Sequence, residues 1–282
     1  MDLQHPLVRR VLNEALQEDL GEGDVTTDTI VPGNTPKRKA RITANSEGIL
    51  AGVSIAREVF RLLSPEVKFA STCHDGTVFS ANMPILEITA PPAPILKGER
   101  LALNFLQRLS GIATLTHAFA QRASRYGVKI LDTRKTAPGL RIFEKYAVKV
   151  GGGYNHRFDL SGGILIKENH IRAVGSVDIA IERAQRNPSP YSRIEVEVAT
   201  LEEVQQVSVL PIDIIMLDNF TLEDMRKAIP IVRQTSRHML IEVSGGVTLE
   251  NLDDISKLGP DFISVGKLTH SAPCIDMSLT ML

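Results

Sequence analysis

The sequence predicts an α/β protein whose second half is built around parallel β-strands, most simply as a barrel that need not be complete. Short runs of β-forming residues alternate there with segments of helical pattern. Residues 200–203 (TLEE) and 221–224 (TLED) resemble helix N-terminal capping signals, and each follows a strand by a few residues. Polar side chains stand at or just beyond the carboxyl ends of the expected strands, where the loops of a barrel build its site.

The first half is expected to begin with a helix and to continue as a small antiparallel sheet. Apolar residues at helical spacing over residues 7–16 predict the helix, which ends at the turn-forming residues 21–24 (GEGD). Residues 39–90 then consist of short apolar runs broken by Gly, Pro, Asn and Asp, with one helix near residues 55–63.

A proline-rich segment, residues 91–94 (PPAP), is expected as a stiff break before a helix over residues 98–126 that is interrupted near Ser110 and Gly111. Six strands should follow, over residues 128–132, 163–167, 193–198, 213–218, 240–244 and 262–266. An open, doubly wound sheet would also collect ligands at its strand ends. No G-x-G-x-x-G follows the first of these strands, however, which favours the barrel.

Composition excludes several classes of function. The chain of 282 residues is 43% hydrophobic and has a net charge of -1, with Lys and Arg dispersed, so a nucleic-acid partner is not expected. The two cysteines, Cys73 and Cys274, have no metal-type spacing, and reduced thiols are the expectation. Neither a signal sequence nor a membrane-spanning run is evident, and we therefore expect a cytoplasmic protein.

Cationic side chains are concentrated in one part of the second half, among glycines that permit close backbone approach to a ligand. They are Arg134, Lys135, Arg141, Lys145, Lys149, His156, Arg157 and Lys167. A solvated basic face is the alternative. Arg134 and Lys135 follow an apolar strand, however, and Lys167 is embedded in one, which favours a cleft for an anionic substrate.

Two carboxylates face these cations in the predicted arrangement. Glu197 and Asp218 end neighbouring strands, and paired carboxylates opposite many cations suit Mg²⁺, which commonly bridges protein carboxylates and substrate phosphates. The alternative is a pair of structural salt bridges with Lys135 and Lys167.

Two glycine turns on the last strands, residues 244–246 (SGG) and 264–266 (SVG), are expected to bind phosphate through their backbone amides. His156 is expected to bind substrate and not to transfer protons, because the adjacent Arg157 favours its neutral form. The other six histidines show no metal-binding spacing and are expected to be structural.

Seven segments together resemble the quinolinate phosphoribosyltransferase family, and the likeness spans nearly the whole chain. The segments are residues 18–28 (EDLGEGDVTTD), 98–114 (GERLALNFLQRLSGIAT), 132–157 (DTRKTAPGLRIFEKYAVKVGGGYNHR), 165–171 (LIKENHI), 194–198 (IEVEV), 216–220 (MLDNF) and 242–247 (EVSGGV). Motifs of this length in this order are much more specific than any single glycine turn or charge pair.

The resemblance implies an N-terminal α/β sandwich over residues 1–110, joined by the tail 271–282, and an incomplete α/β barrel over residues 111–270. It also implies a homodimer, or a higher assembly of dimers, in which each active site receives Arg100 from the other subunit. The substrate-binding set that it implies is Arg100, Thr133, Arg134, Lys135, His156, Arg157, Lys167, Glu197, Asp218, Ser244, Gly245, Gly246, Ser264, Val265 and Gly266.

Within that set, the resemblance implies catalytic roles for Lys135, Glu197 and Asp218, with Mg²⁺ held by Glu197 and Asp218 directly or through phosphoribosyl pyrophosphate. The implied reaction joins quinolinate to phosphoribosyl pyrophosphate and releases CO₂ and pyrophosphate, in de novo NAD biosynthesis. Two alternatives remain open. One is a paralogous phosphoribosyltransferase or pyrophosphorylase that acts on another anionic ring, and the other is a sensor that binds such a ligand without turnover.

Overall fold

The computed structural model describes residues 1–70, 73–186 and 192–282, which form two compact units. The first unit comprises Met1–His117, Thr136–Gly152 and Leu268–Leu282, and the second comprises Ala118–Lys135 and Gly153–Lys267. Residues 111–117 and Thr136–Gly152 thus belong to the same compact unit as the N-terminal residues. Among the described helices, none is both long and apolar enough to cross a membrane.

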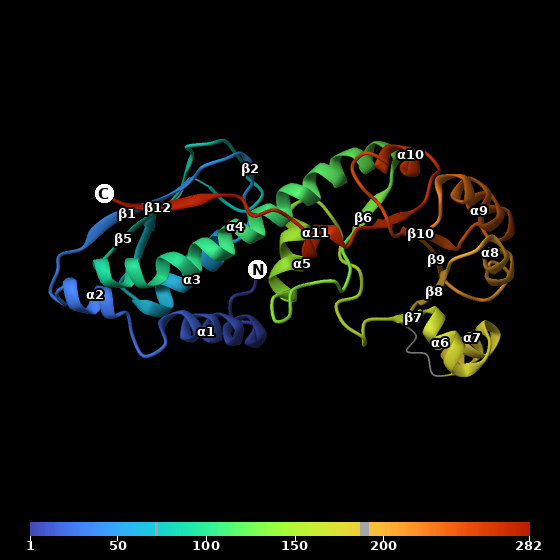
Figure 1. Cartoon of the computed structure of the whole chain (residues 1–282), viewed down its shortest axis with the longest axis horizontal. Helices are drawn as coiled ribbons and strands as arrows, with labels where there is room; N and C mark the ends of the chain where they lie inside the picture. The colour runs from blue at the N-terminus through green and yellow to red at the C-terminus, as the bar shows by residue number, and fades with distance from the viewer. Residues whose placement is uncertain (71–72, 187–191) are drawn as a thin grey trace. The chain divides into compact units, whose positions relative to one another are not determined.

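The first unit contains an antiparallel sheet of four strands, in the order β12-β1-β5-β3. The C-terminal strand β12 pairs with β1, with Ala40 opposite Met281, and Figure 1 shows this red strand beside the blue one. The predicted sheet and the helix near residues 55–63 are confirmed. The elements are α1 (Pro6–Leu20), α2 (Val25–Ile30), β1 (Arg38–Ala44), β2 (Gly48–Ile49), α3 (Val53–Leu63), β3 (Lys68–Ala70), β4 (Val78–Phe79), β5 (Pro84–Ala90), α5 (Arg141–Val150) and β12 (Met277–Met281).

The long helix α4 (Pro92–Ala123) differs from its prediction in two places. It begins within the proline-rich segment, because proline is tolerated in the first helical turn, where its missing N–H would have no partner. It also continues through Ser110 and Gly111. A Cβ on Gly111 would lie 2.0 Å from the carbonyl oxygen of Pro273, and Ser110 exchanges hydrogen bonds with the backbone of Ala51. These two residues therefore serve close packing and do not break the helix.

The second unit contains a parallel sheet of six strands, in the order β6-β11-β10-β9-β8-β7. No pairing joins the edge strands β6 and β7 among the described residues, so the barrel is incomplete, as the resemblance implies. The strands are β6 (Lys129–Leu131), β7 (Ile164–Ile166), β8 (Ile194–Val198), β9 (Ile214–Asp218), β10 (Leu240–Ser244) and β11 (Phe262–Ser264).

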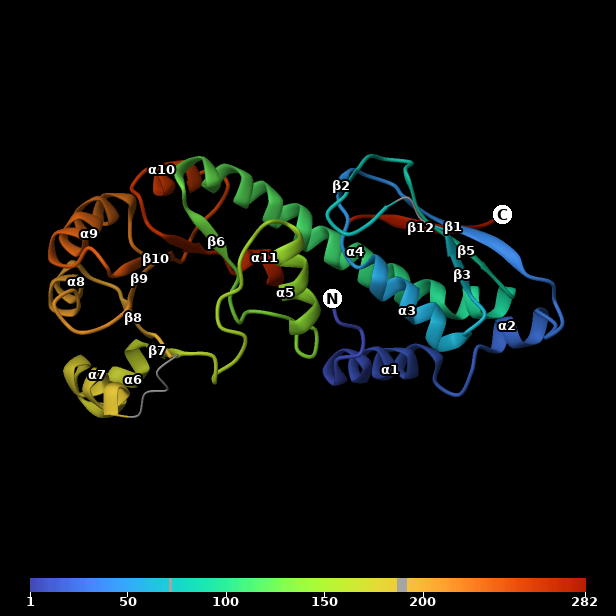
Figure 2. The same ribbon diagram turned by 180° about the vertical axis from the view of Figure 1, so that it is seen from behind.

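Helices follow most of these strands, and Figure 2 shows α8 and α9 on the outside of the sheet. They are α6 (Glu168–Val174), α7 (Val177–Arg186), α8 (Leu201–Val207), α9 (Leu222–Thr235) and α10 (Leu252–Ser256), with a short turn η1 (Ser124–Tyr126) before β6 and α11 (Lys267–His270) after β11. Both predicted N-caps are confirmed. The Thr200 side chain accepts a hydrogen bond from the Glu203 N–H, and the Thr221 side chain accepts one from the Asp224 N–H.

The register of the parallel sheet aligns the ends of its strands. Ser244 lies opposite both Asp218 and Ser264, while Glu242, one level lower, lies opposite Met216 and Phe262. Because side chains alternate between the two faces of a strand, these residues share one face of the sheet. The opposite face carries apolar side chains that are fully buried: Val196, Ile215, Val243 and Ile263. The polar face is therefore the one on which a site can form.

Candidate active site

A cavity of about 480 Å³ opens where the strands of the second unit end. We call it the mouth cavity. It collects most of the predicted site residues and adds four that were not assigned to the site. Its lining is Thr133, Arg134, Lys135, His156, Arg157, Leu165, Lys167, Glu197, Met216, Asp218, Asn219, Glu242, Ser244, Gly245, Gly246 and Ser264.

Three predicted site residues lie elsewhere. Val265, the residue after β11, is buried, and neither it nor Gly266 lines the cavity. Arg100 belongs to the first unit, where it is exposed on α4. The unassigned lining residues are Leu165, Met216, Asn219 and Glu242. A signal for Glu242 was present in the sequence, because a glutamate two residues before Ser244 in an apolar strand must share the face of Ser244.

The cations of the mouth cavity are close enough to affect one another. Burial lowers the pKa of Arg157, and the neighbouring charge of Arg134 lowers it further. The guanidinium of Arg157 is also anchored, because its Nη1 donates a hydrogen bond to the carbonyl oxygen of Gly163 at 2.9 Å. Like charges that line one cavity favour an anionic ligand that neutralises them.

The two predicted carboxylates have different surroundings. Glu197 forms an ion pair with Lys167. This is one of the two salt bridges that the alternative interpretation of the carboxylates predicts. Asp218 accepts a hydrogen bond from the side-chain amide of Asn219 at 2.7 Å. Both carboxylates line the same cavity and come from adjacent strands. Oxygen donors of this kind fit Mg²⁺, with Asp218 held by an amide and Glu197 shared with a lysine.

The turn after β10 brings backbone close to its neighbour. Gly245 and Gly246 have φ angles of +88° and +63°, and Asn219, after the adjacent strand, also has a positive φ of +56°. The Asn219 N–H donates a hydrogen bond to the carbonyl oxygen of Ser244 at 2.9 Å. A Cβ on Gly245 would lie 2.2 Å from the Asn219 side-chain oxygen. The sequence therefore needs glycine here, and the turn exposes backbone to the mouth cavity.

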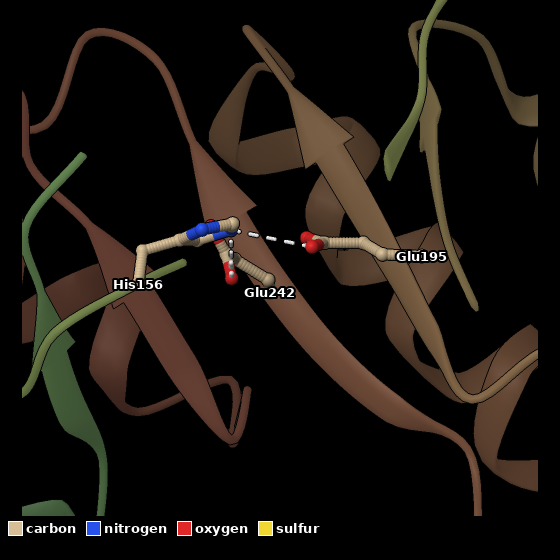
Figure 3. Close-up of side chains that lie close together, drawn as sticks. All are labelled: His156, Glu195 and Glu242. Atoms are coloured by element: carbon tan, nitrogen blue, oxygen red, sulfur yellow. Dashed lines mark ion pairs between the residues drawn. The ribbon is translucent and has the colours of Figure 1, made fainter. Parts of the chain in front are cut away.

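His156 lines the mouth cavity, and one edge of its ring points toward two buried glutamates, Glu195 and Glu242 (Figure 3). Its Nε2 lies 3.2 Å from Oε2 of Glu195 and 3.8 Å from Oε2 of Glu242. Burial raises the pKa of Glu242 to about 7, and the negative charge of Glu195 adds to the rise. These two carboxylates, which sequence reasoning did not assign, surround the ring together with Arg157.

Comparison with known proteins gives a consistent result over the whole chain. Residues 24–110 and 112–280 match family models described as the N-terminal and C-terminal domains of quinolinate phosphoribosyl transferase. A probable carboxylating nicotinate-nucleotide pyrophosphorylase from Bacillus subtilis is 41% identical, with 98% of this chain and 94% of the relative covered. A carboxylating nicotinate-nucleotide pyrophosphorylase from Mycobacterium leprae is 38% identical, with 99% of each chain covered. The crystal structure of NadC from Streptococcus pyogenes superposes with a TM-score of 0.92 at 41% identity, covering 100% of this chain and 99% of that one.

Proposed function

Because the chain belongs to the quinolinate phosphoribosyltransferase family, we propose that it transfers the phosphoribosyl group of phosphoribosyl pyrophosphate to quinolinate, with decarboxylation to nicotinate mononucleotide. The observation that carries this proposal is the mouth cavity, in which cations and two carboxylates line one space. A dianionic ring and a polyanionic sugar phosphate repel each other, and concentrated Arg and Lys side chains make their encounter favourable. The reaction belongs to de novo NAD biosynthesis.

Quinolinate would bind through Arg134, Arg157 and Lys167. Arg side chains can grip a carboxylate with two parallel hydrogen bonds, and two carboxylates require more than one such group. His156 lines the same wall of the cavity. A monocarboxylate would form fewer hydrogen bonds with these cations than a dicarboxylate, which is the physical basis for selecting quinolinate over nicotinate.

Phosphoribosyl pyrophosphate would bind between Lys135, the two carboxylates and the glycine turns. The backbone amides after Ser244 and Ser264 suit the 5-phosphate, because backbone N–H groups in such turns form anion-binding concavities. Glu197 and Asp218 would hold Mg²⁺ directly or through the pyrophosphate. When bound, the ion would neutralise the leaving pyrophosphate.

The chemistry requires no protein nucleophile. The pyridine nitrogen attacks the anomeric carbon of the ribose as the bond to pyrophosphate breaks, and positive charge develops on the sugar. Glu197 and Asp218 would stabilise that charge electrostatically. Once the ring nitrogen is quaternary, its positive charge stabilises the electron pair that stays on ring carbon 2 when the C–C bond breaks. The 2-carboxylate leaves as CO₂, and carbon 2 then takes up a proton from solvent. Arg and Lys act by orienting the two substrates.

Incubation of the purified protein with quinolinate, phosphoribosyl pyrophosphate and Mg²⁺, followed by mass analysis, tests the activity. We expect nicotinate mononucleotide and CO₂ from quinolinate and no comparable turnover of nicotinate. Equal turnover of nicotinate would support a paralogous enzyme that acts on another ring. Ligand binding by calorimetry without any product would support a sensor.

We further propose a cytoplasmic homodimer in which Arg100 acts in the partner's site. Arg100→Ala and Asp218→Ala should each be nearly inactive alone. Random exchange makes half of the dimers mixed, and each mixed dimer has one intact site, so mixing should restore about a quarter of wild-type activity. No recovery, with subunit exchange verified by native mass spectrometry, would refute the shared site.

A further inference from the structure

The histidine and its two glutamates form a partition inside the barrel. A second cavity, of about 390 Å³, lies on the other side of them, and we call it the inner cavity. His156, Arg157 and Glu242 line both cavities, while Glu195 lines only the inner one. Glu195 and Glu242 project from β8 and β10, and both are buried, with 5% and 1% of their surfaces exposed. The inner cavity is lined by first residues of strands, among them Lys129, Ile164 and Phe262. The partition therefore lies between the proposed substrate site at the carboxyl ends of the strands and a cavity at their amino ends.

Hydrogen bonds determine which ring nitrogen carries the proton. The backbone N–H of Arg157 donates to Nδ1 of His156 at 2.7 Å, so Nδ1 must present a lone pair. The proton of the neutral ring is therefore on Nε2, which faces the two carboxylates. A metal-bound histidine usually donates its other ring N–H to an acceptor. Here the other nitrogen is itself an acceptor, so the three side chains are better described as a hydrogen-bonded network than as a cation site.

The backbone around the ring is held as well. The His156 N–H donates to Oδ1 of Asp132 at 2.9 Å, and the side-chain amide of Asn155 donates to Oδ2 of the same carboxylate at 2.6 Å. Tyr154 forms a parallel bridge with Leu131 at the free edge of β6. The segment 154–157 is thus attached to the sheet by its backbone on one side and by the imidazole ring on the other.

We propose that Glu195 and Glu242 are positioning residues for quinolinate: they hold the ring of His156, which fixes the backbone of Arg157 and aims its guanidinium into the mouth cavity. This inference rests on the proposed function. Glu195 keeps one buried oxygen, Oε1, without a hydrogen-bond partner among the described residues. Apolar side chains would avoid the free-energy cost of burying such an oxygen. The carboxylates are therefore better explained by their contact with His156 than by a contribution to stability.

The protonation of Glu242 is consistent with this role. Burial and then the negative charge of Glu195 raise the pKa of Glu242 to about 7, so Glu242 is partly protonated near neutral pH. Glu195 is the nearer of the two carboxylates to Nε2 of His156.

Kinetics of matched variants test the proposal. Glu195→Leu removes the acceptor, whereas Glu195→Gln keeps an oxygen that can accept a hydrogen bond from the Nε2–H group of His156. We expect Glu195→Leu to raise KM for quinolinate roughly tenfold, as for the loss of one buried hydrogen bond, with KM for phosphoribosyl pyrophosphate within twofold of wild type. Glu195→Gln should stay close to wild type, and Glu242→Leu should resemble Glu195→Leu. The control Asp261→Asn, a hydrogen-bonded carboxylate beside the start of β11, should change neither KM. Equal rises in both KM values, or a Gln variant as impaired as Leu, would contradict the proposal.

A measurement without substrate separates this proposal from the proposed function. In NMR spectra of ¹⁵N-histidine-labelled protein, the His156 signals can be assigned by their absence in His156→Gln. They should show the Nε2–H tautomer alone in the wild type and a mixture of tautomers in Glu195→Leu. An Nδ1–H tautomer in the wild type, or a stoichiometric divalent metal in native mass spectra that disappears in Glu195→Leu, would overturn the inference. Failure to turn over quinolinate with the expected tautomer present would refute only the proposed function.

Discussion

Gly245→Ala tests whether the turn after β10 is as tightly packed as its geometry implies. A methyl group at this position would lie 2.2 Å from the side-chain oxygen of Asn219 and 2.8 Å from its backbone nitrogen. The side chain can rotate away, but the backbone nitrogen is held by its hydrogen bond to Ser244. Gly246 provides a matched control, because it also has a positive φ but no heavy atom lies within 4 Å of its ideal Cβ.

The expected difference in melting temperature between the two variants follows from two free-energy costs of adding a methyl group. Both alanine variants must adopt a left-handed backbone, at about 1–2 kcal/mol each. Gly245→Ala adds the cost of overpacking against the Asn219 backbone, about 1–3 kcal/mol. At roughly 2–4 °C per kcal/mol, Gly245→Ala should melt about 2–12 °C below Gly246→Ala.

Thermal unfolding followed by circular dichroism, at one protein concentration and scan rate, measures this difference. The comparison between the two variants removes the shared backbone cost. Equal melting temperatures for Gly245→Ala and Gly246→Ala would refute the argument, because they would show that the Asn219 backbone yields without cost. A larger loss in Gly246→Ala would refute it more strongly.

Three further predictions concern buried or catalytic carboxylates. The pKa of Glu242 is raised from 4.5 to about 7, so between these pH values the folded protein retains a proton that the unfolded chain releases. The free energy of unfolding should therefore fall by up to about 3 kcal/mol as the pH rises through this range. Urea titrations at several pH values should show a weaker pH dependence of that free energy for Glu242→Gln, and an unchanged pH dependence would exclude this cause. Glu144 is fully buried and accepts hydrogen bonds from Arg108 and the Ala137 N–H, so Glu144→Ala should cost about 3–5 kcal/mol by the same titration, and a loss below about 1 kcal/mol would contradict it. Asp218→Asn should lower kcat roughly a hundredfold or more with an unchanged melting temperature, and near-normal activity would make Asp218 structural.

The sequence pattern predicts the strands of the second unit well because each is a short run of consecutive buried, mostly apolar residues. The positions of the polar residues at the carboxyl ends could be predicted for the same reason, since each strand must end where its apolar run ends. The bounds of the helix α4 were predicted less well, because proline and glycine, here Pro92, Pro94 and Gly111, usually indicate a break in a helix. Proline in a first turn costs nothing, and Gly111 is required by the carbonyl of Pro273, a contact between residues more than 160 positions apart.

The environment of His156 shows where local reasoning ends. The charge of its neighbour in sequence, Arg157, was expected to favour its neutral form, and the structure shows that the backbone N–H of Arg157 contacts the ring. The groups facing the ring's other nitrogen come from β8 and β10, and nothing near His156 in the chain indicates them. The alternation of side chains along a strand nevertheless indicates part of this environment. Glu195 precedes Glu197 by two residues, and Glu242 precedes Ser244 by two, so each glutamate must share the face of a predicted site residue one level deeper in the barrel. A charged residue one level below a predicted site, within an apolar strand, therefore indicates a supporting group for that site.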